Sequence, residues 1–191
     1  FGPGVTLAPP NSSAIFVNNA GTLTIEGQIN NPNGQGVALA GTNALGVVRV
    51  TGRLGGSGGG SIRVRTAGTV ILDAGSPDYT RFFQVDSGVC RLNHPDALAK
   101  AGVTLNGGTL QLRADDDATF PFGNYAYVYG SGAVIDVNRL DPLAGTATDK
   151  TLRVNGLSPG NGSTFTVAGA NGYRLEVGRL VFGNGYPSTA T

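Results

Sequence analysis

The chain has 191 residues, of which 32 are Gly and 10 are Pro, and its charged residues make up only 13%, about half the usual share. The net charge is +1, which excludes the strongly basic surface that nucleic acids or anionic membranes attract. Hydrophobic residues make up 40% of the chain and recur in ordered alternation, so we expect a folded chain rather than a disordered one.

Two absences bear on the origin of the chain. It contains no Met, so we expect a processed chain or a fragment. Its single Cys, Cys90, forbids an intrachain disulfide, and the composition, rich in Gly, Asn and Thr and poor in Cys and Lys, is typical of a bacterial surface protein. No apolar stretch approaches the roughly 18 residues of a membrane helix, so we expect an extracellular or cell-surface location without membrane insertion.

A repeat predicts the fold. Each unit has two alternating apolar positions, a short corner ending in Gly, and two more alternating apolar positions. Only one helical turn is expected, at residues 95–100. In chain order, clear units occupy residues 15–25, 62–72, 83–92 and 103–112; a degenerate unit spans 126–137, with a bulge expected at Asp136, and looser units follow from residue 152.

The period of the repeat favours an all-β solenoid. Gly68, Gly88 and Gly108 are spaced at equal intervals, and a period of about 20 to 25 residues is typical of stacked coils that share one core. We expect a parallel β-helix of about eight coils and about 40 Å, with residues 15–182 as its body, 1–14 as an arm or first coil and 183–191 as a tail. The alternative is a β-sandwich, whose strand spacing the sequence also satisfies.

Residues 68–112 carry a resemblance to a known family. The segments Gly-Thr-Val-Ile-Leu, Phe-Gln-Val-Asp-Ser-Gly-Val-Cys-Arg-Leu and Val-Thr-Leu-Asn-Gly-Gly-Thr-Leu-Gln-Leu resemble the autotransporter-associated β-strand repeat of bacterial surface passenger domains. The resemblance implies a secreted, elongated parallel β-helix that serves as a stalk or adhesin.

The residues that bear on catalysis favour a non-enzyme. The repeat places Cys90 in line with Val70 and Leu110, facing inward, and His94 is the only His. A buried thiol acts as a small hydrophobic group, so we expect no Cys–His pair. A carbohydrate-active enzyme would instead need converging outward groups. The candidates, all expected to face outward, are Asp73, Asp86, Arg63, Arg65, Arg91 and Arg113, and we expect Arg65, Asp86 and Asn106 to form a ladder across successive coils.

One acidic cluster is a weak candidate for a metal site. Asp115, Asp116 and Asp117 are adjacent, and carboxylate oxygens are the ligands that Ca²⁺ prefers. The alternative is a polar loop, and no other cofactor is expected.

Two further features indicate contact surfaces. If Ala126 and Val128 face the core, then Tyr125, Tyr127 and Tyr129 line the outer face, where they would stack on sugars, contact a protein, or pack under the loop 139–150. Neither terminus shows an amphipathic capping helix, and Phe1, Phe182 and Tyr186 lie in similar Gly-rich terminal segments.

Three functions remain open at this point. Uncapped coil ends associate head to tail, so the leading hypothesis is a structural subunit of an extracellular fibre, with a second copy of the chain as its partner. The second is an adhesin that binds a glycan or a cell-surface protein, and the third is a carbohydrate-active enzyme.

Overall fold

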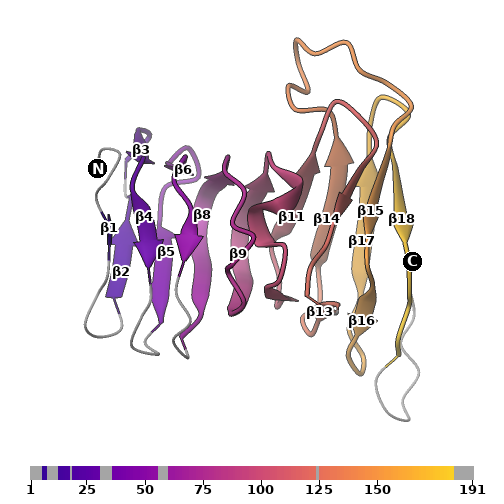
Figure 1. Cartoon of the computed structure of the whole chain (residues 1–191). Coiled ribbons are helices and arrows are strands. Elements are labelled where there is room, and N and C mark those ends of the chain that lie inside the picture. The colour runs from indigo at the N-terminus through magenta and orange to yellow at the C-terminus, as the bar shows by residue number, and fades with distance from the viewer. Residues whose placement is uncertain are drawn as a thin grey trace.

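The computed structural model describes residues 6–7, 13–17, 19–30, 36–55, 60–123 and 125–182, and it is a parallel β-solenoid (Figure 1). Every strand pair in it is parallel. Successive coils lie side by side from β1 to β18, and those two strands are at opposite ends of the stack. This confirms the solenoid and rules out the sandwich.

Each coil has up to three faces, and the first two are joined through the Gly corner. The strands of the first face are β2 (Ser13–Phe16), β5 (Val37–Gly41), the first half of β8 (Ile62–Leu72), the first half of β9 (Phe82–Leu92), β10 (Gly102–Leu105), β13 (Ala126–Val128) and β16 (Leu157–Pro159). The strands of the second face are β3 (Thr22–Ile25), β6 (Val47–Val50), the second halves of β8 and β9, β11 (Thr109–Arg113), β14 (Ala133–Asn138) and β17 (Phe165–Gly169).

The third face is built differently along the stack. At the N-terminal end it holds β1 (Thr6–Leu7), β4 (Gln28–Asn30) and β7 (Leu54–Gly55), and at the C-terminal end β12 (Ala118–Phe120), β15 (Thr151–Val154) and β18 (Arg174–Val177). Between them, residues 73–81 and the single 3₁₀ turn η1 (Pro95–Leu98) take the place of strands, and η1 is the short helical turn that the sequence predicts.

The core consists of inward side chains stacked from coil to coil. Val70, Cys90 and Leu110 align as expected, and all three are fully buried. On the third face, Tyr79 and Leu98 fill the space of the absent strands, and the Tyr79 hydroxyl donates to the Phe82 carbonyl at 2.9 Å. Because each coil buries only a few apolar residues, neighbouring coils must complete its core.

Two glycines show why the corner requires this residue. Gly88 and Gly108 have φ of +71° and +66°, and a Cβ on Gly88 would lie 2.2 Å from the Thr66 carbonyl oxygen. Only glycine tolerates both the left-handed backbone and the close approach of the preceding coil.

Two expectations about the coils were wrong. The described strands make about six turns between β2 and β16, not eight, because the coils lengthen toward the C-terminus. The coil that starts at Val85 reaches its aligned position at Leu105, whereas the coil that starts at Val128 does not reach its aligned position until Pro159. The register of β11 on β14 is continuous through Asp136, so Ile135 and Val137 face inward, as the sequence predicts, but without the expected bulge. Within the described residues no helix is long and apolar enough to cross a membrane.

Candidate functional site

The outer face of the first sheet carries a line of side chains set by the strand register. Outward residues of successive coils align there: Ala38, Arg63, Gln84, Thr104, Tyr127 and Ser158. Around this line lies a shallow groove of about 460 Å³, which we call the outer groove, lined by Arg63, Phe82, Gln84, Thr104, Asn106, Tyr127 and Tyr129. Small-ligand sites span about 300 to 1,000 Å³, so the groove is large enough for one.

Three tyrosines project from β13 and its flanks, as the sequence predicts. Ala126 and Val128 are fully buried, which turns the intervening ring outward, and Tyr129 is 60% exposed. The rings of Tyr127 and Tyr129 stack with centroids 5.9 Å apart and planes within 6°, whereas Tyr125 meets Tyr127 edge-on at 6.0 Å. The Tyr127–Tyr129 pair thus closes one end of the outer groove with aromatic surface.

The next coil leaves room for these rings. A Cβ on Gly156 would lie 2.7 Å from the Tyr125 ring, and one on Gly160 would lie 2.8 Å from the Tyr129 ring. Arg179 donates from Nη1 to the Tyr125 hydroxyl at 2.9 Å and lies 5.7 Å from its ring centroid. The rings of Tyr125 and Tyr129 therefore lie against the following coil.

Two polar groups of the outer groove lack partners among the described residues. The Gln84 Oε1 atom is buried without a hydrogen bond. Arg63 has no ion pair or hydrogen bond there, although its positive charge helps to lower the pKa of Asp86. Unpaired groups of this kind are available to a ligand, because a buried acceptor gains the full value of a hydrogen bond when one is offered.

By contrast, Arg65 and Asp86, two other charges that the sequence places on the outer surface, are engaged in a cross-coil ladder. Asp86 accepts from Arg65 Nε at 2.8 Å and from Asn106 Nδ2 at 2.6 Å, which is the ladder the sequence predicts. Partial burial opposes the charged form of Asp86, but these two hydrogen bonds, together with the charges of Arg63 and Arg65, outweigh it and hold its pKa below the ordinary value.

A second ladder on the next face has the same chemistry. Asp73 accepts from Arg49 Nε at 2.5 Å and from Asn93 Nδ2 at 2.7 Å. In both ladders a central Asp joins the Arg of one coil to the Asn of the coil after next. The two carboxylates are therefore engaged in joining coils.

Arg113 was expected to face outward, and that expectation was wrong. The residue is 2% exposed and forms an ion pair with Asp136, while its Nη1 donates to the carbonyls of Leu112 and Asp136. It lies at the end of β11, where the alternation of outward and inward residues stops.

Arg91 does face outward, as expected. It donates to Gln111 at 2.9 Å, and Gln111 in turn donates to Asp136 at 3.1 Å. Burial, followed by the charge of Arg113, lowers the pKa of Arg91.

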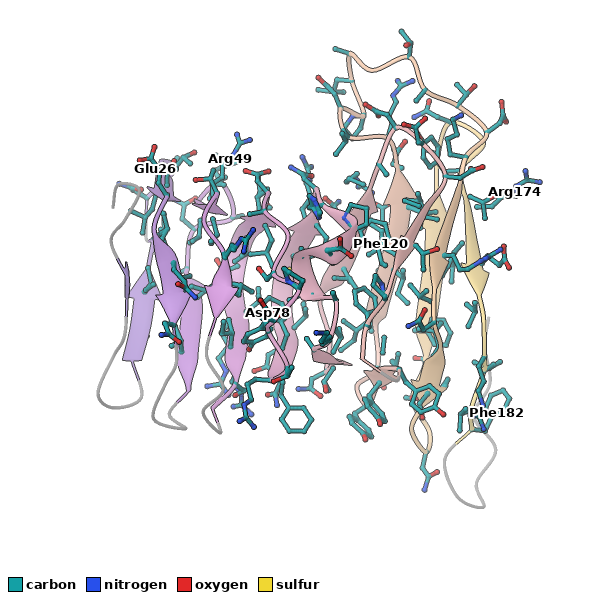
Figure 2. The ribbon with its side chains drawn as sticks, in the orientation of Figure 1. Glu26, Arg49, Asp78, Phe120, Arg174 and Phe182 are labelled. Atoms are coloured by element: carbon teal, nitrogen blue, oxygen red, sulfur yellow. The ribbon has the colours of Figure 1, made fainter. Side chains whose placement is uncertain are left out.

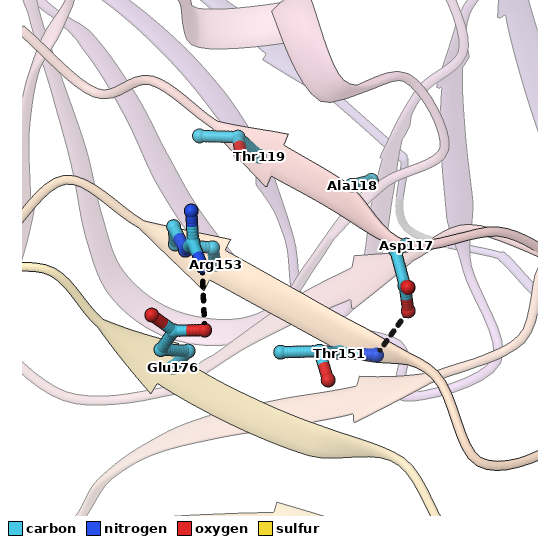
Figure 3. Close-up of a pocket in the computed structure, with 6 residues that line it drawn as sticks. All are labelled: Asp117, Ala118, Thr119, Thr151, Arg153 and Glu176. Carbon is cyan, nitrogen blue, oxygen red and sulfur yellow. Dashed lines mark hydrogen bonds and ion pairs between the residues drawn. The ribbon is translucent and has the colours of Figure 1, made fainter.

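A second hollow, of about 290 Å³, lies on the outer side of the third face between β12, β15 and β18 (Figure 3). Arg153 faces Glu176 across it, and the two form an ion pair at 2.8 Å. Asp117 accepts from the Thr151 backbone N–H at 2.7 Å. Because its charged groups are already paired with one another or with the backbone, this hollow offers a ligand less than the outer groove does.

The acidic cluster 115–117 anchors the loop 139–150. Asp115 accepts from the Leu140 N–H at 3.0 Å, and Asp117 accepts from Thr151, so the two carboxylates bind the two ends of this loop. Leu143 at its tip is 96% exposed, and the loop stands clear of the coils (Figure 1). Across the described ranges, no three His, Cys, Asp or Glu side chains group closely enough to hold a metal ion.

Cys90 and His94 have separate structural roles. Cys90 is fully buried in the apolar stack, and burial raises the pKa of its thiol. The Nδ1 atom of His94 accepts from the Asp96 N–H at 3.0 Å and so caps η1. Each side chain has a structural contact of its own.

The C-terminal coil leaves apolar side chains uncovered by the described residues. Val167 on β17 is 45% exposed, and Leu180 and Phe182 are exposed as well; Phe182 projects from this end in Figure 2. Among the described strands, β17 pairs only with β14 and β18 only with β15, so each has one open edge. Phe1 and Tyr186, the other expected contact residues, lie outside the described residues.

Sequence reasoning found the three tyrosines but missed the floor of the groove. Gln84 and Thr104 share a register position with Tyr127, and aligning outward as well as inward positions of the repeat would have found them. The contacts of the tyrosine rings with Gly156 and Gly160 could not be found in this way, because in the sequence both residues look like ordinary corner glycines.

Comparison with protein-family models, with curated proteins and with solved structures finds no match. Fold and surface together define a parallel β-solenoid with an aromatic-ended groove along one sheet and an open C-terminal coil.

Proposed function

We propose that the chain is a structural, non-catalytic subunit of an extracellular fibre or stalk, in which one copy stacks on the next through its terminal coils. The observation that carries this proposal is the open C-terminal coil. The edges of β17 and β18 have backbone donors and acceptors with no partner among the described strands. Such edges pair readily with another strand.

The occupant that fits best is the first coil of a second copy. The described coils meet through parallel strand pairs, and apolar side chains stack across them on the inner side. Val167 and Leu175 end two of these inward stacks, next to Ile135 and Leu152, and a further coil would continue both stacks. A contact between unlike ends does not close, so it propagates. The extracellular location is part of the proposal and draws on the composition and on the resemblance of residues 68–112.

Sedimentation velocity over a dilution series tests the association. We expect the native chain to form species that grow with concentration and Val167→Lys to remain monomeric, because a charge would be buried in the contact. Leu143→Lys, at the tip of the loop, is the matched control and should associate as the native chain does. A native chain that stays monomeric at every concentration, or a Val167→Lys variant that associates normally, would contradict the proposal.

A further inference from the structure

The outer groove combines two kinds of surface, aromatic rings and polar side chains. Phe82 lies in the fourth stacked coil and the Tyr127–Tyr129 pair in the sixth, with Gln84, Thr104 and Asn106 between them. Phe82 also lies across Gly102, whose Cβ would fall 3.0 Å from the ring. The result is a polar floor between aromatic walls, open to solvent along the axis of the coils.

This arrangement matches the chemistry of a saccharide. Sugars present C–H faces that pack on aromatic rings, and hydroxyl groups that pair with amides and hydroxyls. Tyr129 offers an exposed ring, and Gln84 Oε1 is an acceptor that lacks a donor among the described residues. A protein partner would need a larger apolar surface than these isolated rings supply.

The charge in the groove indicates an acidic saccharide. Arg63 carries no ion pair with a described residue, whereas the neighbouring Arg65 is neutralised by Asp86. Arg63 and Tyr127 are three coil steps apart in the register, which is about 14 Å at the spacing of adjacent strands. One sugar ring cannot reach both, so the ligand must be an oligosaccharide.

We propose that the outer groove binds an acidic oligosaccharide, with one sugar ring packed on Tyr129 and a carboxylate paired with Arg63. Gln84 Oε1 accepts from a sugar hydroxyl, and Asn106 and Thr104 line the path between the two anchors. This site is separate from the open C-terminal coil, so it holds whether or not the chain assembles into a fibre.

Isothermal titration calorimetry with a tetramer of galacturonic acid tests the site, and a tetramer of galactose is the uncharged comparison. We expect the native chain to bind the acidic tetramer in preference to the neutral one, with an affinity that falls as salt is raised. Tyr129→Ala and Arg63→Gln should each weaken binding about tenfold, as truncation of a central contact residue does. Tyr129→Phe keeps the ring and should bind normally.

Tyr125→Ala is the matched control, because Tyr125 belongs to the same strand region but does not line the groove. It should retain native affinity. None of these side chains is in the core, so circular dichroism should show all four variants folded. Failure of the native chain to bind the acidic tetramer, or unchanged affinity in both Tyr129→Ala and Arg63→Gln, would overturn the proposal. Equal binding of the two tetramers would overturn the acidic assignment. Sedimentation behaviour stays native in these variants, which separates this test from that of assembly.

Discussion

The central coils and the C-terminal coils of this solenoid share one backbone plan but differ in regularity. In residues 62–113, the first two faces merge into the long strands β8 and β9, and aligned residues recur at nearly constant spacing. In residues 126–177 the strands are shorter and the loop 139–150 interrupts the coil. The stacked tyrosines and the exposed side chains of Leu143 and Val167 belong to this less regular part.

The difference shows that contacts between coils restrict the residue type more in the central coils than in the C-terminal ones. In the central coils nearly every position contacts a coil on both sides, so the inward stacks and the Asp-centred ladders dictate residue type. In the C-terminal coils, longer corners release positions from that constraint, and large side chains appear on the surface there. Departures from the repeat are therefore the places to search for function.

The largest expected effect comes from a charge in a central stack. Leu110→Asp should prevent folding, because an unpaired carboxylate in this fully buried position costs more than about 4 kcal/mol. Gln111→Asp should fold, since its carboxylate lies beside Arg91 in the outward ladder, and the lost hydrogen bond to Asp136 costs less than a charge buried in the core. Circular dichroism and urea melts measure both, and equal tolerance would mean that the register is wrong.

The next largest difference in stability should lie between a buried and an exposed Arg–carboxylate pair. Arg113→Ala leaves Asp136 without its buried partner and should lower the free energy of unfolding by about 3 kcal/mol. Arg153→Ala breaks the exposed pair with Glu176 and should leave the melting temperature nearly unchanged. Thermal melts that shift equally would contradict the distinction between the buried and the exposed pair.

Corner glycines provide a matched pair with similar backbone angles. Gly88→Ala should cost at least about 3 kcal/mol, because the left-handed φ is disfavoured and the new Cβ meets the Thr66 carbonyl. Gly132 has φ of +78° with nothing within 4 Å of a Cβ, so Gly132→Ala should cost only about 1 kcal/mol. Chemical denaturation measures both costs. A Gly88→Ala variant as stable as Gly132→Ala would refute the tight packing of the central corners.

The smallest effect concerns acid stability. The pKa of Asp86 is lower in the folded state than in the unfolded chain, so its contribution is complete above the unfolded pKa of about 3.9 and disappears as the pH falls through the folded value. Because the side chain is partly exposed, we expect less than about 1 kcal/mol. Asp86→Asn should therefore lose stability at pH 7 but less so at pH 2, as urea melts at both values would measure. A constant difference between the two proteins would contradict this role.

Sequence reasoning recovered the regular coils well and the irregular ones less well. The alignment of Cys90 with Val70 and the Arg65–Asp86 ladder follow from a repeat of nearly constant length, and the structure confirms both. The burial of Arg113 could not be predicted, because it depends on how β11 ends. The role of Asp115 as an anchor of a distant loop was hidden for a similar reason, since three strands, β12, β13 and β14, separate it from its partner Leu140.

Electron microscopy of the purified chain across a dilution series tests the central claim, that the open C-terminal coil accepts the first coil of another copy. The seven first-face strands from β2 to β16, at about 4.8 Å per coil, give an axial repeat of about 34 Å once the junction between two copies is included. We expect filaments with this repeat in the native chain and isolated particles in Val167→Lys. Isolated short particles of the native chain at every concentration would contradict the claim.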